Sequence, residues 1–521
     1  MKQKLLWIII IILCAFIILW PLLKPGFFLT DDGDWMIIRL SAFYQTLREG
    51  QFPVRFLGRL NNSYGYPVSN FLYPGFLYIG SIFHFLGFSF IQSIEAIFAL
   101  SIIGGAIATF FWLREHFSLL ASFLGTLSFL FAPYLLFDIY VRGSVGEVLA
   151  MGVACACLLA VEKKLYVLFS PLLFLLLLSH NSLGILFSFI FFMMILVKKD
   201  TRGIIAWLFG IGMATFFWFP AFYERKYVIF DHVDVSHPSQ YFIGVRNIFL
   251  IGIPSIISAL YLAFTIKKQS QNKIYILFII VAGLLALPIT SIFWNGGVLA
   301  KLFQFPYRFL SVCLVFGSYA IAKVIDLAPQ KLQNILSILF FIVFLIPLKD
   351  SLLTVKYVNL PVGYYSTNEA TTTVANEYMP KWVREIPQER TFSRMVFIKG
   401  RGTIEEHVAT TQKINASVTA LEDSILQINS IYYPGWGITV NDIPVKIDYE
   451  NINGLIRFNV PRGTYRIIAE FRETVPRFMA NIVSIIFFLT YGVITVREYF
   501  SNRKSLYIQH DGEVLKKKKK H

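Results

Sequence analysis

The sequence has 521 residues, of which 56% are hydrophobic and 15% are charged. Soluble domains carry about 25% charged residues, so water is not the main solvent of this chain. The formal net charge of +16 does not indicate a nucleic-acid partner, because the Lys and Arg residues gather in short loops between apolar segments. That distribution is the positive-inside bias of membrane proteins.

Apolar segments near the ~20 residues that cross a bilayer predict a polytopic α-helical membrane protein with about 12–13 transmembrane helices. The thirteen segments cover residues 5–24, 73–88, 91–113, 118–136, 145–161, 165–180, 182–197, 203–222, 247–266, 274–293, 308–325, 332–348 and 477–496. The first has no small-residue cleavage site and is expected to remain as a helix. Basic termini place both chain ends in the cytoplasm, which requires an even number of crossings. One of the segments 73–88, 91–113 and 118–136 is therefore expected not to cross.

The alternation of basic loops also predicts the domains. The outer stretches are the first loop 25–72, the shorter stretches 137–147, 223–246 and 294–307, and the long stretch 350–476. The expected units are a transmembrane domain 1–349, an extracytoplasmic domain 350–476, a final helix 477–496 and a cytoplasmic tail 497–521. The tail contains five consecutive lysines before His521 and is expected either to contact anionic lipid or to be solvated.

Residues 350–476 change in character, because apolar and polar residues begin to alternate. Period-two runs cover Ser424–Ile431, Gly437–Val440, Leu455–Val460 and Thr464–Phe471, with turn pairs at Pro434-Gly435, Asn441-Asp442 and Arg462-Gly463. The pattern predicts antiparallel strands in a β-sandwich-like domain. All four cysteines lie in apolar segments, so neither a disulfide framework nor a thiolate metal site is expected.

The first outer loop carries the acidic motif Asp31-Asp32-Gly33-Asp34, directly after the first predicted helix. Clustered carboxylates repel one another unless a cation or a basic partner neutralises them. The motif therefore indicates a catalytic or metal site, and the alternative is a solvated turn that caps the next helix. The amphipathic stretch Arg39–Arg48 that follows is expected to lie along the membrane surface.

Several polar residues fall at the ends of predicted spans, on the same outer side as this motif. Arg142 and Arg308 are candidate phosphate ligands, because a guanidinium group binds phosphate with two parallel hydrogen bonds. The alternatives for these arginines are snorkelling to the interface or ion pairs with Glu147 and Glu224. His180 has two interpretations as well, a catalytic residue or part of a turn.

Short motifs spread over most of the chain carry a family resemblance. They are Asp32-Gly33-Asp34, Gly50-Gln51-Phe52-Pro53-Val54-Arg55, Tyr64-Gly65-Tyr66-Pro67, Tyr140-Val141-Arg142-Gly143-Ser144, Leu178-Ser179-His180-Asn181, Phe217-Trp218-Phe219-Pro220-Ala221 and Gln304-Phe305-Pro306-Tyr307-Arg308. In this order they resemble the GT-C superfamily of glycosyltransferases, and within it a group of prokaryotic membrane proteins often labelled as related to pyruvoyl-tetrahydropterin synthase. Tyr433-Pro434-Gly435-Trp436 and Val460-Pro461-Arg462-Gly463 resemble the outer domain of YfhO-like proteins. A His expected beside the acidic motif is replaced here by Asp31 and Met36.

The resemblance implies transfer of a sugar from a polyprenyl-phosphate donor to a glycan, lipid or protein acceptor on the outer face of the plasma membrane. It implies Asp32 as the base, with Asp34 sharing that role or binding a divalent cation such as Mg²⁺ or Mn²⁺ together with Asp32. The expected substrate-binding residues are Arg142, His180, Glu224, Gln304 and Arg308. Asp32 and Asp34 are expected to share one cavity with Arg142, His180 and Arg308. The alternative function is a non-catalytic scaffold or a transporter for envelope polymers, and spans almost free of charge favour the enzyme.

Overall fold

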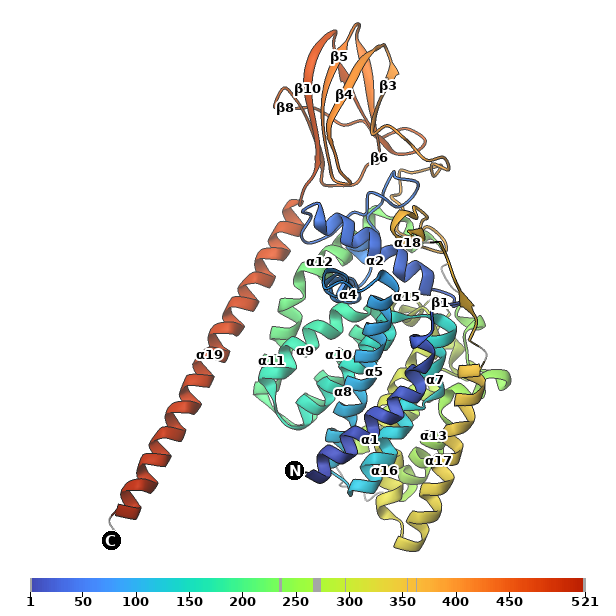
Figure 1. Ribbon diagram of the computed structural model, residues 1–521, viewed down its shortest axis with the longest axis vertical. Coiled ribbons are helices and arrows are strands. Elements are labelled where there is room, and N and C mark those ends of the chain that lie inside the picture. Colours follow the sequence, from blue (N-terminus) through green and yellow to red (C-terminus); the bar gives the residue numbers. More distant parts are fainter. Residues whose placement is uncertain are drawn as a thin grey trace.

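The computed structural model describes residues 2–233, 237–265, 273–295, 297–353, 355–361 and 363–518. A bundle of helices carries a β-rich domain at one end (Figure 1). The last helix, α19 (Val475–Lys518), starts beside the β-rich domain and packs against α11 and α12 of the bundle. The start of α1 and the end of α19 both lie away from the β-rich domain (Figure 1).

Helices make up most of the chain before residue 354. Those of the bundle are α1 (Lys2–Leu19), α5 (Phe90–Arg114), α6 (Leu119–Leu130), α7 (Pro133–Phe137), α8 (Val145–Glu162), α9 (Tyr166–Ser179), α10 (Asn181–Val197), α11 (Thr201–Met213), α12 (Thr215–Glu224), α13 (Ile253–Thr265), α14 (Lys273–Leu285), α16 (Leu310–Leu327) and α17 (Gln330–Leu353). Shorter elements between them include α2 (Gly33–Arg48), α3 (Val68–Phe71), α4 (Gly75–Phe85), α15 (Val298–Phe303), α18 (Tyr364–Thr367) and the π-helical turn η2 (Asp138–Arg142).

Every predicted span falls on helical chain, but not every one of these helices is long enough to be a full span by itself. Six of the described helices are long and apolar enough to cross a membrane, or eight if each of two bent pairs counts as one span. The remaining five are shorter apolar helices: Gly75–Phe85, Tyr166–Ser179, Asn181–Val197, Lys273–Leu285 and Gln330–Ile346. Apolar residues in turns extend an apolar run without extending a helix, as between Leu285 and Pro288, where proline stops the helix. The chain is a multi-pass α-helical membrane protein.

Helix α4 is the early apolar segment that does not follow the bundle. It has 11 residues, which is about 16 Å at 1.5 Å per residue and roughly half of a bilayer core. Figure 1 shows α4 end-on beneath α2, whereas α5 runs down the bundle. Of the three early segments, 73–88 is therefore the one whose helix does not run along the bundle.

Residues 395–471 form two antiparallel sheets that enclose one core, as the alternating pattern predicted. The strand orders are β4-β5-β10-β7-β8 and β3-β6-β9. Side chains from both sheets, among them Ile414, Ile428 and Ile467, are fully buried between them. The strands are β3 (Met395–Lys399), β4 (Gly402–Ala409), β5 (Lys413–Ala420), β6 (Ser424–Ile431), β7 (Trp436–Val440), β8 (Ile443–Pro444), β9 (Leu455–Val460) and β10 (Gly463–Phe471).

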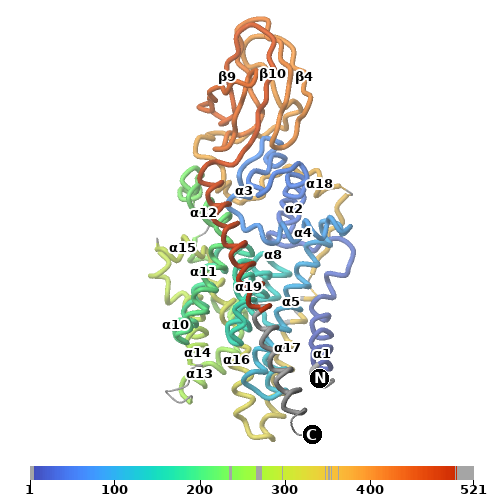
Figure 2. The backbone as a smooth tube through the Cα atoms, turned by 90° about the vertical axis from the view of Figure 1, so that its left-hand side faces the viewer, coloured from blue at the N-terminus to red at the C-terminus, as the bar shows by residue number. Residues whose placement is uncertain are grey.

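The chain between α17 and β3 returns to the loop that follows α1 and packs against α2. Strand β1 (Phe27–Phe28) pairs with β2 (Tyr357–Val358) in antiparallel register. Farther along, the Ser41 hydroxyl of α2 donates a hydrogen bond of 2.5 Å to the Tyr365 carbonyl. Figure 2 shows α2, α3 and α18 between the bundle and the β-rich domain. Residues 355–394 thus form part of the layer that joins the two.

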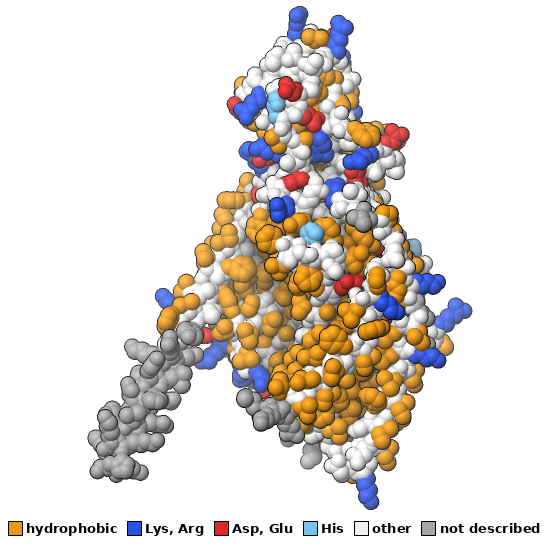
Figure 3. All heavy atoms as spheres, in the orientation of Figure 1, with side chains coloured by type: hydrophobic (Ala, Val, Ile, Leu, Met, Phe, Trp, Pro, Cys, Tyr) orange, Lys and Arg blue, Asp and Glu red, His pale blue; other side chains and the backbone are white. Residues whose placement is uncertain are grey.

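Side-chain types on the surface follow the same division. Figure 3 shows hydrophobic side chains over the visible face of the bundle, with charged side chains on and around the β-rich domain and further Lys and Arg toward the opposite end. An apolar band between two charged ends is the surface of a protein that lies in a bilayer. The layer with α2 therefore lies at one edge of the apolar band.

Candidate active site

A cavity of about 330 Å³ lies where α2, η2, α10 and α12 meet the returning segment 373–378. Its charged lining residues are Asp32, Arg39, Arg142, Arg225, Lys301, Arg308 and Glu377. His180 and Gln304 line it as well. Apolar side chains that are open to the surroundings complete the wall, among them Ile185, Phe222 and Leu302. The cavity therefore combines a charged interior with an apolar rim.

Backbone contacts hold the acidic motif against the end of the π-helical turn η2. The amides of Asp31 and Asp32 donate hydrogen bonds of 2.9 Å and 2.8 Å to the carbonyls of Val141 and Arg142. Gly143 follows with φ of +66°, and a Cβ there would lie 2.8 Å from the Gly33 nitrogen. Only glycine allows this approach without strain. The local chain thus fixes Asp32 beside Arg142.

Burial affects the acidic turn itself. It raises the pKa of Asp31, the negative charge of Asp32 raises that pKa further, and Arg142 opposes the rise. Asp31 does not line the cavity. The turn therefore presents Asp32, and not Asp31, to the cavity.

Arg142 is the cation nearest to Asp32. Its Nη2 lies 3.7 Å from Asp32 Oδ2, and its Nη1 lies 3.0 Å from Asp138 and 2.6 Å from Glu147. The guanidinium group also lies over the Tyr307 ring, 5.2 Å from its centroid. These contacts leave Arg142 one orientation, with an edge toward Asp32 and the cavity.

Glu147 connects Arg142 to two other predicted site residues. Arg308 Nε donates a hydrogen bond of 2.9 Å to Glu147 Oε1, and His180 Nε2 lies 3.6 Å from the same oxygen. Glu147 is fully buried. A single carboxylate thus holds two guanidinium groups and an imidazole together, which offsets much of their mutual repulsion.

His180 and Gln304 have defined partners at the cavity wall. The backbone amide of Leu183 donates to His180 Nδ1 at 3.2 Å, so His180 caps α10 and carries its proton on Nε2 when neutral. Gln304 Oε1 accepts a hydrogen bond of 2.9 Å from Arg308 Nη1. Gln304 therefore orients Arg308, and the cap on α10 leaves His180 Nε2 near Glu147.

Arg39 is a cavity residue that the sequence did not single out. It is 5% exposed, and its Nε donates a hydrogen bond of 2.8 Å to the Thr372 hydroxyl. Among the residues that the structure describes, no carboxylate lies within 4.0 Å of its guanidinium nitrogens. The spacing of Asp32, Met36 and Arg39 places all three on one face of a helix, and this signal could have identified Arg39 as a cavity residue.

Lys301 and Glu377 also line the cavity without having been predicted. Glu377 is 8% exposed and comes from the segment that returns after α17. Lys301 comes from α15, far from both Asp32 and Glu377 in sequence. The sequence carries no motif that links these three positions, so only the fold reveals them.

Two predicted site residues lie elsewhere. Asp34 Oδ1 accepts a hydrogen bond of 2.7 Å from the Tyr365 hydroxyl and does not line the cavity. Glu224 is 1% exposed, and its Oε2 accepts hydrogen bonds from Asn70, Tyr433 and Arg477 at 2.8–2.9 Å. These partners come from α3, the β-rich domain and α19, so Glu224 joins three parts of the fold.

The predicted divalent-cation site at Asp32 and Asp34 does not fit this geometry. Only Asp32 faces the cavity, and its nearest charged partner is a guanidinium group. Within the described ranges, no group of three or more His, Cys, Asp or Glu side chains is arranged for a metal ion. Carboxylate and other oxygen ligands in larger number are what Mg²⁺ and Mn²⁺ require. We therefore derive no step through a metal.

Comparison with known proteins gives a structural likeness only. No protein-family model matches the sequence, and no curated protein matches it. The apo oligosaccharyltransferase of Archaeoglobus fulgidus is 13% identical, with a TM-score of 0.49 over 72% of this chain and 61% of that chain. The mycobacterial arabinofuranosyltransferase AftD is 14% identical, with a TM-score of 0.44 over 67% of this chain and 26% of that chain. ArnT from Cupriavidus metallidurans is 14% identical, with a TM-score of 0.42 over 64% and 62%.

The chain thus spans less than two thirds of the length of each of these proteins. The three likenesses cover between 64% and 72% of this chain, and all three TM-scores lie below 0.5. A further structure of the Archaeoglobus enzyme contains Zn and sulfate. At such identities, likeness in fold does not carry an activity or a substrate from one protein to another.

Proposed function

We propose that this chain transfers a sugar from a polyprenyl-phosphate donor to an acceptor on the outer face of the plasma membrane. One observation carries the proposal. Asp32 and the guanidinium groups of Arg39, Arg142 and Arg308 line a single cavity whose rim is apolar. A lipid-linked sugar phosphate has the matching parts, an anionic group between a sugar and a long hydrocarbon chain.

The three arginines are the proposed phosphate ligands. Arg39 has no carboxylate partner among the described residues, so its charge is available to a ligand. Arg142 and Arg308 share Glu147 and are oriented before any substrate arrives. Preorganised cations of this kind stabilise the negative charge that grows on a departing phosphate. The prenyl chain would lie along exposed apolar residues such as Ile185 and Phe222.

Asp32 is the proposed base. In the transfer, the acceptor oxygen forms a bond to the anomeric carbon of the sugar, and the bond from that carbon to the phosphate oxygen breaks. Asp32 takes the proton of the acceptor hydroxyl, and the polyprenyl phosphate leaves with the bonding electron pair. General-base catalysis requires Asp32 within hydrogen-bond reach of that hydroxyl, and the cavity beside Asp32 has the space for it.

The orientation in the membrane is part of the proposal. The β-rich domain and the cavity would face outward, and both chain ends would face the cytoplasm. The basic turns at Lys163-Lys164 and Lys198-Lys199 support it, since cytoplasmic loops are enriched in Lys and Arg. The end of the bundle that carries the start of α1 also lies away from the β-rich domain.

A transporter is the weaker alternative. Transporters place ionisable residues near the middle of their spans. Here Asp138 and Arg142 lie at the end of the span Leu119–Arg142, and Arg308 lies at the start of the span Pro306–Leu327. The charged groups therefore collect at one membrane boundary, as an interfacial enzyme requires.

The test is a transfer assay with the purified full-length protein in lipid nanodiscs. A panel of polyprenyl-phosphate sugars would be scored for release or transfer of the sugar, with wild type and Asp32→Asn compared at equal amounts of folded protein. We expect turnover of at least one donor by wild type and its loss in the variant. Absence of turnover across a broad panel would contradict the proposal and favour a scaffold.

A further inference from the structure

A second polar groove lies between α2 and the β-rich domain. It consists of two adjoining hollows of about 390 Å³ and 660 Å³, which share Gln45, Glu49, Arg59 and Ser366 as lining residues. Neither hollow shares a lining residue with the candidate active-site cavity. The groove is therefore a separate feature and plays no part in the transfer step proposed above.

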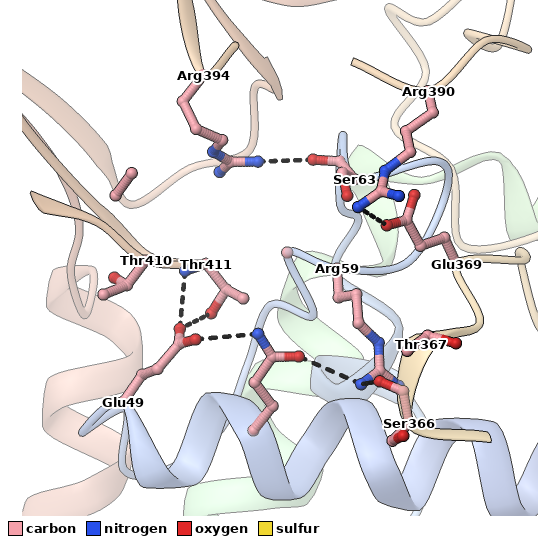
Figure 4. A pocket seen from close by; sticks show the side chains of 13 residues that line it. Glu49, Arg59, Ser63, Ser366, Thr367, Glu369, Arg390, Arg394, Thr410 and Thr411 are labelled. Atoms are coloured by element: carbon pink, nitrogen blue, oxygen red, sulfur yellow. Dashed lines mark hydrogen bonds and ion pairs between the residues drawn. The ribbon is translucent and has the colours of Figure 1, made fainter. Parts of the chain in front are cut away.

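Guanidinium groups dominate one end of the groove. Arg59 lines it from the loop after α2, Arg390 and Arg394 line it from the segment before β3, and Figure 4 shows all three around the same space. Burial lowers the pKa of Arg59 to about 10 and also lowers the pKa of Arg394. In both cases the loss of hydration of the positive charge outweighs the attraction of the nearby carboxylates.

Arg394 is the clearest case of missing compensation. Its Nη1 donates a hydrogen bond of 2.6 Å to the Ser63 carbonyl. Its Nε and Nη2 are buried and have no hydrogen-bond partner among the described residues. These two nitrogens form the edge with which arginine binds a carboxylate through two parallel hydrogen bonds. A buried hydrogen-bond donor without an acceptor destabilises the protein. An oxygen atom of a ligand bound at this edge would remove that cost.

The floor of the groove is ordered by its own hydrogen bonds. Glu49 Oε2 accepts from the backbone amide and the hydroxyl of Thr411 at 2.7 Å and 2.5 Å. Gln45 donates to Glu49 Oε1 at 3.0 Å and accepts from Arg59 at 3.2 Å. Glu369 Oε1 lies 3.1 Å from Arg390 Nη2. Figure 4 shows Glu49 with Thr411 and Glu369 with Arg390, together with the side chains of Ser366, Thr367 and Thr410.

Aromatic rings line the other end of the groove. The His84 ring stacks on Phe90 with centroids 3.8 Å apart, and Tyr44 meets His84 edge-on at 4.6 Å. All three residues line the larger hollow. Such rings present flat apolar faces on which the C–H face of a sugar packs well. The groove therefore offers aromatic, hydroxyl, carboxylate and guanidinium groups in one continuous surface.

We infer that this groove binds an acidic oligosaccharide. A uronate carboxylate would pair with the arginine end, sugar hydroxyls would exchange hydrogen bonds with Glu369 and the Ser and Thr hydroxyls, and a ring would pack on the aromatic end. A phosphate or a lipid headgroup would use the arginines alone. The inference stands whether or not the chain transfers sugar, because binding requires no donor.

The test measures binding of two hexasaccharides to the full-length protein in nanodiscs, without any donor. Hexagalacturonate carries a carboxylate on every sugar, and maltohexaose carries none. We expect wild type to bind hexagalacturonate and to bind maltohexaose at least about tenfold more weakly. Arg390→Gln, at a side chain that is 61% exposed, should weaken hexagalacturonate binding about tenfold, since it removes a charge-assisted contact. Arg394→Gln should weaken it at least as much.

Arg401→Gln is the matched control, because Arg401 is an 80% exposed arginine of the β-rich domain that pairs with Glu422 and does not line the groove. We expect it to bind as wild type does, and each variant to keep the wild-type unfolding temperature. If Arg394→Gln fails to fold, Arg390→Gln alone decides. Equal binding of both sugars, no binding of hexagalacturonate, or equal weakening by Arg401→Gln would each overturn the inference. Intact binding without any transfer would instead count against the transferase proposal alone.

Discussion

The Tyr365 hydroxyl donates a hydrogen bond of 2.7 Å to Asp34 Oδ1. Asp34 therefore faces the returning segment, whereas Asp32 lines the cavity. The cause is the start of α2, since positions two residues apart on a helix point about 200° away from each other. The two carboxylates of the acidic motif are thus separated at the point where the helix begins.

The first prediction follows from this separation. Asp32→Asn should lower sugar transfer by roughly 10²–10⁴, the usual contribution of a general base. Asp34→Asn should change transfer by less than about tenfold, because its side chain holds Tyr365 and does not reach the cavity. Initial rates with a polyprenyl-phosphate sugar measure both effects.

The unfolding temperatures of both Asn variants serve as the control, since a partly exposed substitution shifts stability by under about 0.5 kcal/mol. Full activity in Asp32→Asn, together with loss of activity in Asp34→Asn, would reverse the two assignments. It would also mean that α2 changes its start when substrate binds.

The second prediction concerns Arg308. Its Nε contacts Glu147 and its Nη1 contacts Gln304 and the Phe303 carbonyl, each at 2.9 Å. Lysine keeps the charge but has one nitrogen, which cannot make these contacts and also bind phosphate. Arg308→Lys should therefore weaken donor binding by about tenfold or more, measured as a rise in KM for the donor.

Lys301→Arg is the matched control, since it keeps a positive charge on the same cavity wall. We expect its KM for the donor to stay near the wild-type value. If Arg308→Lys binds donor as wild type does, Arg308 holds Glu147 in place and the phosphate is bound by Arg39 and Arg142.

Much of the fold follows from patterns within single segments. The runs Ser424–Ile431 and Leu455–Val460 match β6 and β9 residue for residue, because the side chains that point into the core, such as Leu426, Ile428, Ile456 and Phe458, recur at every second position. Strand β5 went unpredicted since two of its inward residues are Ala416 and Ala420. Small residues give a weak apolar signal. Bends such as that between α11 and α12 were equally hidden inside one apolar run.

Only those site residues that belong to a recognisable short motif could be predicted from the sequence. Asp32, Arg142, His180, Gln304 and Arg308 share a cavity, and each was identified from a motif at the end of a span. Glu377 reaches the cavity through the fold of the segment after α17, and no pattern within a single segment records such a contact. Glu224 looked the same as these residues in sequence, because an acid at the end of a span has the same sequence position whether it joins domains or binds substrate.

The third prediction concerns the ion pair between Glu224 and Arg477. The atoms lie 2.8 Å apart, and the side chains are 1% and 0% exposed. Removing one partner leaves a buried charge unpaired, which typically costs about 3–5 kcal/mol. Glu224→Gln should therefore lower the free energy of unfolding by this amount in detergent. Glu115→Gln is the control, since its partner Lys163 is exposed and such pairs contribute under about 1 kcal/mol.

A small effect of Glu224→Gln, similar to that of Glu115→Gln, would show that the junction of α3, α19 and the β-rich domain does not depend on this charge. Substrate binding by Glu224 would then become the better interpretation. A loss of donor affinity at unchanged stability would support it directly.

The fourth prediction tests the orientation in the membrane. One cysteine would be added in each of two variants, Lys199→Cys and Arg401→Cys, and probed in intact cells with a membrane-impermeant maleimide. We expect labelling at 401, which belongs to the β-rich domain, and none at 199 until the cells are opened. Three native cysteines, Cys155, Cys157 and Cys313, are buried, and Cys14 is half-buried, so the protein without an added cysteine measures the background. Labelling at 199 but not at 401 in intact cells would invert the proposed topology.

The last prediction uses a glycine with no chemical role of its own. Gly143 has φ of +66°, and a Cβ at this position would lie 2.4 Å from Thr30 Oγ1 and 2.8 Å from the Gly33 nitrogen. Gly143→Ala should push the acidic motif away from η2 and lengthen the Asp32–Arg142 contact, now 3.7 Å. A displacement of about 1 Å near reacting groups lowers rates by roughly 10²-fold, so transfer should fall by about that factor. Gly104→Ala is the control, because a Cβ at Gly104 meets no atom within 4 Å and should leave transfer unchanged. Wild-type rates in Gly143→Ala would mean that this close approach does not position Asp32, and the fixed geometry proposed for the base would be wrong.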